Sequence, residues 1–182
     1  MNYLIGIDGG GTGCRAMVCD RHGARLGTGN AGPANIMTNF EAAQKNIVQA
    51  CENAFHDAGI SPGAIANSDA FLGLAGANAR EAAEQTKANM PFRNCLIETD
   101  AVTSLEGAIG SADGAVAIIG TGSVFIYRVN GEIRTVGGWG YMIGDLGSGS
   151  RLGRELLQES LLVFDGIHNG SDLTKKVLDN FK

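Results

Sequence analysis

The feature that most constrains the fold is a glycine-rich loop between two strand-like segments near the N-terminus. Residues 5–18 read IGIDGGGTGCRAMV, and the part after the glycines is alternating and mostly apolar, with no residue suited to capping a helix. A dinucleotide-binding fold needs a helix there, because the helix N-terminus meets the pyrophosphate. A Walker P-loop needs a Lys after the loop, and none follows. The sequence therefore predicts a tight hairpin whose backbone amides form an anion-binding nest.

Asp8 ends the first strand directly before the glycines. A carboxylate beside phosphates requires a divalent cation between the two anionic groups, so this position implies Mg²⁺. Thr12 and Arg15 can add hydrogen-bond donors to phosphate oxygens. The alternative is an ordinary glycine-rich hairpin in which Asp8 is a turn residue.

The N-terminal pattern returns in the second half of the chain. AVAIIGTGS at residues 115–123 predicts a strand running into glycines, where Gly120-Thr121-Gly122 repeats Gly11-Thr12-Gly13. Each tripeptide is followed by a strand, a turn that ends in glycine and a third strand, and the second turn is an Asn-Gly pair typical of hairpins. We interpret this shared order as an internal duplication, which predicts two lobes, residues 1–112 and 113–182.

Two segments predict amphipathic helices from their apolar spacing. In residues 41–58, one face carries Ile47, Ala50, Cys51, Ala54 and Phe55, and Gly59 provides a C-terminal stop. In residues 148–166, the face expected to point inward carries Leu152, Leu156, Leu157, Leu161 and Phe164. The second lobe then has a β-meander and two helices but no returning strands, so we expect it to be incomplete.

Asp100 lies where the strand NCLIETD, residues 94–100, passes into a helix. From that position a carboxylate can face a cleft between lobes, where it can accept a proton from a hydroxyl and orient it for phosphoryl transfer. The alternative is that Asp100 only caps the helix. Its position between two phosphate loops favours the catalytic interpretation.

The stretch GGWGYMIGDLGSGS, residues 137–150, contains the only Trp of the chain. Glycines around an aromatic pair and an acid suit a loop that wraps a polar ligand, with Trp139 as an apolar wall and Asp145 accepting hydrogen bonds from hydroxyls. The alternative is Trp139 as a core plug beneath a mobile loop. Asn35, in the loop at residues 29–36, could bind a sugar hydroxyl or amide, although by itself it would be a turn residue.

Composition excludes several classes of function. The net charge of −5 argues against nucleic-acid and anionic-membrane partners, which need basic patches. The longest apolar runs are too short to span a bilayer, and no secretory signal pattern precedes the first strand. The four cysteines lack any metal-binding spacing, so we expect reduced, buried thiols in a cytoplasmic protein.

Six segments in order, DGGGTGCRAMV, AGPANI, GLAGA, ETDA, IIGTGSV and GGWGYMIGDLGSGSRLGRELL, resemble the BadF/BadG/BcrA/BcrD ATPase family, and within it N-acetylglucosamine and glucosamine kinases. The resemblance covers nearly the whole chain. It implies an α/β, actin-like ATPase fold of the ribonuclease H-like type, shared by sugar kinases, Hsp70 and actin, with duplicated lobes. It also implies phosphorylation of an amino sugar, most readily at the 6-hydroxyl, with ATP and Mg²⁺ as cofactors. A homodimer is left open.

The resemblance assigns roles to particular residues. Asp100 would be the general base, and Asp8 would hold the metal through water. Residues at the ATP phosphates would be Asp8, Gly9, Gly10, Gly11, Thr12, Gly13 and Arg15 in the first loop and Gly120, Thr121, Gly122 and Ser123 in the second. The sugar would be bound by Asn35, Gly138, Trp139, Gly140 and Asp145.

Two departures from the family pattern affect these expectations. The family motif usually reads Asp-Glu-Gly-Ser or Asp-Gln-Gly-Ser, whereas Leu146 follows Asp145 here, which leaves the exact sugar open. Family members also continue past this C-terminus into the segment that holds adenosine, so we expect weakened or absent nucleotide binding by these 182 residues alone.

Two other functions remain as alternatives. One is an ATPase that activates a 2-hydroxyacyl-CoA dehydratase or a benzoyl-CoA reductase, which requires an iron–sulfur cluster with Cys ligands. The scattered cysteines argue against it. The other is a non-catalytic sugar-sensing or assembly module, which both phosphate loops and Asp100 disfavour.

Overall fold

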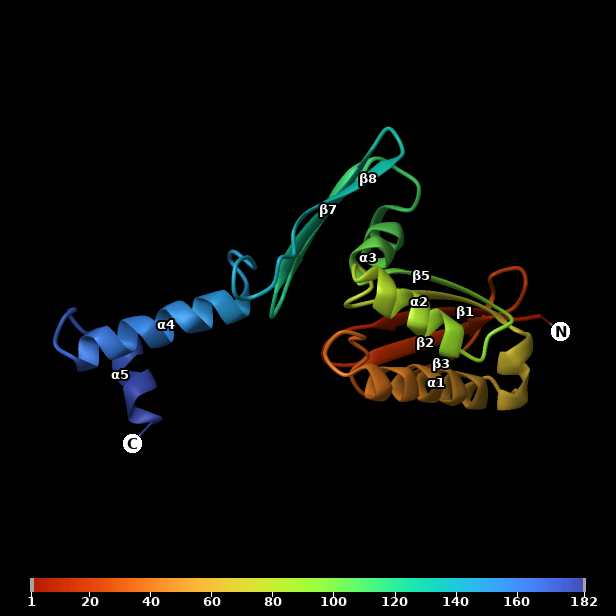
Figure 1. Ribbon diagram of the computed structural model, residues 1–182, viewed down its shortest axis with the longest axis horizontal. Helices are drawn as coiled ribbons and strands as arrows, with labels where there is room; N and C mark the ends of the chain where they lie inside the picture. Colours follow the sequence, from red (N-terminus) through yellow and green to blue (C-terminus); the bar gives the residue numbers. More distant parts are fainter. Residues whose placement is uncertain (1, 182) are drawn as a thin grey trace. The chain divides into compact units, whose positions relative to one another are not determined.

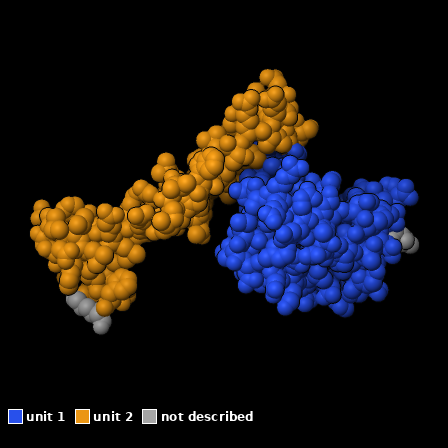
Figure 2. Space-filling model, in the orientation of Figure 1, with its two compact units in different colours: residues 1–107 blue, residues 108–182 orange. Residues whose placement is uncertain are grey.

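The computed structural model describes residues 2–181 and divides the chain into two compact units, residues 1–107 and residues 108–182 (Figure 2). The unit boundary falls inside helix α3 (Asp100–Ile109), while the lobe boundary after residue 112 stays a prediction. Within residues 2–181, no helix is both long enough and apolar enough to cross a bilayer.

The first unit is built on a mixed five-stranded sheet with the strand order β3-β2-β1-β4-β5. Its strands are β1 (Leu4–Gly9), β2 (Cys14–Cys19), β3 (Arg25–Ala31), β4 (Asp69–Leu74) and β5 (Asn94–Thr99). The first three form an antiparallel meander, and β4 and β5 run parallel to β1. The carboxyl ends of β1, β4 and β5 therefore lie at one edge of the sheet, where Asp8 is the last residue but one of β1 and Asp100 directly follows β5.

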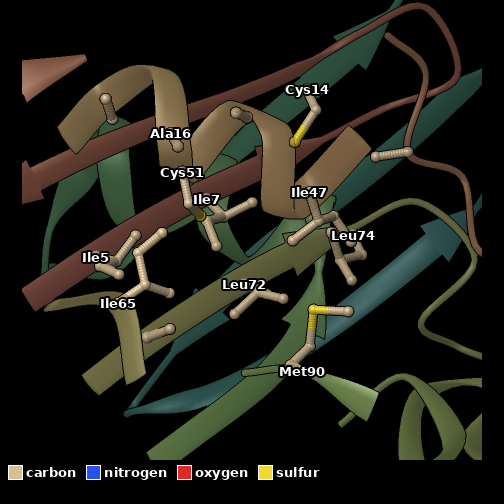
Figure 3. Packing of buried hydrophobic residues seen from close by; sticks show 14 of the residues in the cluster. Ile5, Ile7, Cys14, Ala16, Ile47, Cys51, Ile65, Leu72, Leu74 and Met90 are labelled. Carbon is tan, nitrogen blue, oxygen red and sulfur yellow. The ribbon is translucent and has the colours of Figure 1, made fainter. Parts of the chain in front are cut away.

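Helix α1 (Phe40–Asp57) covers one face of this sheet and lies along β2 and β3 (Figure 1). The predicted inward face is confirmed, since all five of its apolar side chains are fully buried. Figure 3 shows Ile7 and Ala16 of the strands packed with Ile47 and Cys51 of the helix. The short helix η1 (Pro62–Asn67) and α2 (Arg80–Asn89) complete the unit.

The edge strand β3 approaches α1 so closely that only glycine fits at two of its positions. A Cβ on Gly29 would lie 2.2 Å from the carbonyl O of Ala50 and 2.4 Å from the amide N of Ala54. A Cβ on Gly27 would lie 2.5 Å from the carbonyl O of Ala54. These atoms belong to a helix backbone, which cannot rotate away as a side chain can. The two glycines therefore set how deeply α1 packs onto the meander.

The second unit begins with a three-stranded antiparallel meander formed by β6 (Gly114–Ile119), β7 (Ser123–Val129) and β8 (Glu132–Gly137). Its order repeats that of β1, β2 and β3, as the sequence repeat predicts. The turn between β7 and β8 has φ of 53° at Asn130 and 79° at Gly131, the left-handed pair that an Asn-Gly hairpin adopts. Helices α4 (Gly149–Phe164) and α5 (Asp172–Asp179) follow.

The expectation that the apolar face of residues 148–166 points inward is wrong for most of its side chains, although Leu156 is half-buried. Leu152, Leu157 and Leu161 are 59%, 46% and 59% exposed, and Phe164 is 74% exposed. Helix α4 packs mainly against α5, and its fully buried side chain is the small Ser160. Helical periodicity correctly indicated an apolar stripe, but periodicity does not specify which element covers it.

The close approach of β3 to α1 predicts that Gly29→Ala destabilises the chain by about 2–3 kcal/mol, because the new Cβ must displace helix backbone. The matched control is Gly6→Ala in β1, where no atom lies within 4 Å of the added Cβ. This control should be neutral or slightly stabilising, since alanine lowers the entropy of the unfolded chain. Urea unfolding of both variants measures the difference, and equal stabilities would contradict the packing argument.

Candidate functional site

The first glycine loop joins β1 to β2 and is fixed by two backbone hydrogen bonds at Gly10. The N–H of Gly10 donates to the carbonyl of Gly13 at 2.9 Å, which closes the turn, and the carbonyl of Gly10 accepts from the N–H of Ala34 at 2.9 Å. Neither Gly11 nor Thr12 donates its backbone N–H to another residue in the described part of the chain. Both residues are exposed. Free, adjacent amides at an exposed turn form the kind of nest that binds phosphate oxygens.

Asp8 and Arg15 form an ion pair at the base of this loop. They are direct partners across β1 and β2, and Arg15 Nη2 donates to Asp8 Oδ2 at 2.5 Å. The side chains are 45% and 76% exposed. An ion pair this exposed contributes at most about 1 kcal/mol. Its carboxylate and guanidinium can therefore separate at little cost, one toward a cation and the other toward a phosphate.

The donor set near Asp8 fits Mg²⁺ held through water. Mg²⁺ usually keeps several waters and binds through one or two carboxylates together with substrate phosphates. Residues 2–181 contain no group of three or more His, Cys, Asp or Glu side chains that could hold a metal ion. A single carboxylate beside a phosphate nest suits an ion that arrives with the nucleotide.

Asp100 is the first residue of α3, but it is not the residue that caps the helix in the usual way. Thr99 Oγ1 accepts from the N–H of Val102 at 3.3 Å, which is the typical geometry of an N-cap side chain. The Asp100 carboxylate instead accepts from the adjacent N–H of Ala101, at 3.0 Å, and from its own backbone N–H. The usual N-cap contact is therefore made by Thr99, while the Asp100 carboxylate accepts from backbone N–H groups at the very start of α3.

The pKa of Asp100 is raised above its ordinary value of 3.8. Burial is the largest cause, because it disfavours the charged form, and repulsion from the Asp8 carboxylate adds to it. The interaction also shows that Asp8 and Asp100, whose strands end at one edge of the sheet, lie within electrostatic reach of each other. A carboxyl with a raised pKa beside a second carboxylate is typical of functional sites.

Two residues that the sequence analysis did not single out determine where Asp100 lies. A Cβ on Gly73 of β4 would lie 1.9 Å from Thr103 Oγ1, so α3 is seated directly on this glycine. Thr103 Oγ1 also donates to the carbonyl of Asp100 at 2.9 Å. A cavity of about 450 Å³ on this face is lined by Asp8, Arg15 and Thr103, among others. The available signal was a glycine inside the apolar strand DAFLGL, which often marks a close approach.

Asn35 occupies a turn in the first unit. Its Oδ1 accepts from the N–H groups of Met37, at 2.9 Å, and Thr38, at 3.2 Å. These contacts are those of the turn residue that the sequence analysis gave as the alternative. A role in sugar binding stays a prediction, and it would use the amide nitrogen of the side chain.

The second glycine loop, in the other unit, is also fixed by two backbone hydrogen bonds, although its turn is one residue shorter than that of the first loop. The N–H of Gly120 donates to the carbonyl of Gly122 at 2.9 Å, and the carbonyl of Gly120 accepts from the N–H of Gly149 at 2.8 Å. The N–H groups of Thr121 and Gly122 make no hydrogen bond to the rest of the described chain. This loop too leaves adjacent amides free for an anion.

Asp145, predicted to bind sugar, contacts the second loop. Its Oδ1 accepts from the N–H of Ser123 at 3.2 Å, and a Cβ on Gly122 would lie 3.0 Å from its Oδ2. Its φ of 54° is a left-handed conformation, which Asp tolerates better than most residues. The side chain therefore holds the loop in place in this structure.

Trp139 does not plug a core, since 75% of its surface is exposed. That alternative from the sequence is wrong. Its neighbours Gly138 and Gly140 have φ of 70° and 81°, conformations that favour glycine. The segment thus presents an aromatic side chain to solvent on a tightly turned backbone, as expected of a ligand-wrapping loop, although its role in sugar binding stays a prediction.

Comparison with known proteins matches residues 5–180 to the BadF/BadG/BcrA/BcrD ATPase family. The chain is 39% identical to glucosamine kinase GspK of Vibrio cholerae, over 100% of this chain and 62% of that protein. It is 30% identical to N-acetylmuramic acid/N-acetylglucosamine kinase of Clostridium acetobutylicum, over 100% of this chain and 61% of that protein. The chain thus spans about three fifths of the length of these relatives.

A solved structure from Chromobacterium violaceum, provisionally assigned as an N-acetylglucosamine kinase, superposes with a TM-score of 0.91 at 35% identity. The match covers 97% of this chain and 63% of that one. Together with the family match, it confirms the expected α/β, actin-like ATPase fold.

The raised pKa of Asp100 predicts that Asp100→Asn stabilises the chain at pH 7. A carboxyl whose pKa is higher in the folded state lowers stability as the pH rises from its ordinary value of 3.8 through the raised pKa. The gain from the variant should therefore shrink as the pH is lowered through that window. Thermal unfolding across pH 4–7 measures it.

Asp20→Asn is the matched control with the opposite sign. Backbone hydrogen bonds from Ala24 and His22 lower the pKa of Asp20, so its stabilising contribution is present at pH 7 and is lost as the pH falls. This variant should be destabilised at neutral pH. If Asp100→Asn were also destabilised at neutral pH, then burial and repulsion from Asp8 would not determine the pKa of Asp100.

Proposed function

The chain belongs to the BadF/BadG/BcrA/BcrD ATPase family, and from that premise we propose that it transfers the γ-phosphoryl group of ATP to a hydroxyl of an amino sugar. Relatives that carry the names glucosamine kinase and N-acetylmuramic acid/N-acetylglucosamine kinase support this class of substrate. The observation that carries the proposal is the arrangement in the first unit, where an acid with a raised pKa lies near Asp8 and its phosphate nest.

The first loop would bind phosphate oxygens through the N–H groups of Gly11 and Thr12. Mg²⁺, when bound through water to Asp8, would neutralise charge on the transferred phosphoryl group. Arg15 would leave Asp8 and donate to a phosphate oxygen, an exchange that their exposed, weak ion pair permits. The loop and its ion pair thus provide positioning and charge, which are the main requirements of phosphoryl transfer.

Asp100 would accept the proton of the attacking sugar hydroxyl, which we assign as the 6-hydroxyl. A base works best when its pKa lies near the operating pH, and burial moves the pKa of Asp100 in that direction. Thr103, through the carbonyl of Asp100, would hold the start of α3 in place. Asn35 would donate its amide to the sugar from the turn that fixes its carbonyl.

In the second unit, Gly120, Thr121, Gly122 and Ser123 would form a further phosphate-binding loop. Gly138, Trp139 and Gly140 would place an aromatic face and backbone groups against the sugar ring, with Asp145 accepting a hydroxyl hydrogen bond. Leu146, in place of the family's acid or amide, removes one polar group beside Asp145 and so alters which substituents of the sugar are recognised.

The cysteines favour this function over the iron–sulfur ATPase alternative. Burial raises the pKa of Cys14 to about 12, and it also raises the pKa of Cys51 and Cys95. Cluster ligands must be reachable by iron, whereas these three thiols lie in the hydrophobic core of the first unit. Buried reduced thiols are also what a cytoplasmic kinase would carry, and we place the reaction there.

The proposed base predicts that Asp100→Asn lowers kcat by about 10²- to 10⁴-fold, the usual contribution of general-base catalysis. The KM for ATP should change little, because Asp100 does not contact the nucleotide in this scheme. Glu98→Gln is the matched control, since it removes a carboxylate from the same end of β5 and should leave kcat within about threefold. The assay follows ADP release by the protein expressed from its complete gene. Near-normal turnover by Asp100→Asn would refute the assignment.

The same role predicts an acid limb in the pH dependence of kcat/KM. Activity should fall as the pH is lowered through the raised pKa of Asp100, because the protonated carboxyl cannot accept the hydroxyl proton. The residual activity of Asp100→Asn should lack this limb. If the acid limb persists unchanged in Asp100→Asn, the limb reports the titration of another group.

A further inference from the structure

A group of three serines connects the second glycine loop to the start of α4, and none of the roles above uses their hydroxyls. Ser123 ends the loop, Ser148 is the N-cap of α4, and Ser150 lies in its first turn. Ser148 is fully buried and Ser123 is 5% exposed. Buried hydroxyls of this kind persist only where they are hydrogen-bonded, so each must make a specific contact.

The hydroxyl of Ser150 bonds directly to the loop. Ser150 Oγ donates to the carbonyl of Thr121 at 2.6 Å, and the N–H of Ser150 donates to the same oxygen at 3.1 Å. The preceding N–H, that of Gly149, donates to the carbonyl of Gly120 at 2.8 Å. Two successive loop carbonyls are thus held by the first turn of one helix.

The other two serines fix the ends of this connection. Ser123 Oγ donates to the carbonyl of Leu146 at 3.0 Å. Ser148 Oγ accepts from the N–H of Arg151 at 3.2 Å and lies 3.2 Å from Ser150 Oγ. The N–H of Ser148 donates to the carbonyl of Asp145 at 3.0 Å. Residues 145–150 therefore follow the loop as one hydrogen-bonded segment.

These contacts decide which side of the loop backbone is available to a ligand. The carbonyls of Gly120 and Thr121 are both bound on the α4 side, while the N–H groups of Thr121 and Gly122 have no partner within residues 2–181. The amides at the start of α4 are also used on the loop. The first amides of α4 are therefore already used within the protein, and the amides left free in this region are those of the loop.

We propose that Ser150 is a positioning residue for the second phosphate loop: its hydroxyl holds the Thr121 carbonyl so that the loop amides stay turned toward a phosphate. The inference rests on the proposed function, in which this loop contacts ATP. Ser150 is the informative member of the group, because its hydroxyl is the one that reaches the turn itself. It is also half-buried, so its loss leaves no large cavity.

The test compares Ser150→Ala with Ser150→Thr, which keeps the hydroxyl, and with the matched control Ser160→Ala. Ser160 Oγ also donates to a backbone carbonyl, that of Leu156 at 2.8 Å, but within α4 and away from the loop. Amide hydrogen exchange at Gly149 and residue 150 reports the loop contact without any need for activity. Ser150→Ala should exchange there about fivefold faster, the factor expected for one lost hydrogen bond, and the other two variants should match the wild type.

Kinetics of the protein from the complete gene provide the second readout. Ser150→Ala should raise the KM for ATP by about fivefold and leave the KM for the sugar unchanged, with rescue by Ser150→Thr. Unchanged exchange at these amides, or a raised sugar KM with normal ATP KM, would overturn the proposal. If the wild type phosphorylates no sugar, the proposed function fails, and the exchange experiment still decides whether Ser150 holds the loop.

Discussion

One hydrogen bond in each unit, from a following segment to the carbonyl of a loop glycine, holds the glycine loop of that unit in place. In the first unit the N–H of Ala34 holds the carbonyl of Gly10, and in the second the N–H of Gly149 holds the carbonyl of Gly120. Both donors follow the third strand of their meander. Each contact fixes the carbonyl on one side of a tight turn and so leaves the adjacent amides free. The two loops therefore share a tripeptide and a held glycine carbonyl, although the held glycine precedes the tripeptide in the first unit and begins it in the second.

The raised pKa of Asp100 in the first unit depends on a close contact between α3 and β4. Because Gly73 has no side chain, α3 lies against β4 through Thr103, and this brings Asp100 within electrostatic reach of Asp8. Burial and repulsion then raise the pKa of Asp100. The position of α3 against β4 thus places Asp100 where its pKa is raised. Asp100 is not needed as the usual N-cap, since Thr99 provides that contact.

Local patterns in the sequence were enough to predict much of this fold. The glycines followed by an alternating segment predicted the first hairpin, Asn130-Gly131 predicted the second meander's turn, and spacing predicted the buried face of α1. Contacts between distant segments could not be predicted in this way. The bond from Ser123 to Asp145 and the seat of Thr103 on Gly73 depend on three-dimensional packing. The apolar stripe of α4 could be predicted from the sequence, but the element that covers such a stripe could not.

We propose that the protein to which this chain belongs phosphorylates an amino sugar. The most direct measurement is coupled ADP release by the protein expressed from its complete gene, with glucosamine, N-acetylglucosamine or glucose as the acceptor. The account predicts ADP release that depends on one or both amino sugars, is much slower with glucose, and yields a sugar phosphate in equal amount. ADP release at the same rate without any sugar, or no release with either amino sugar, would contradict it.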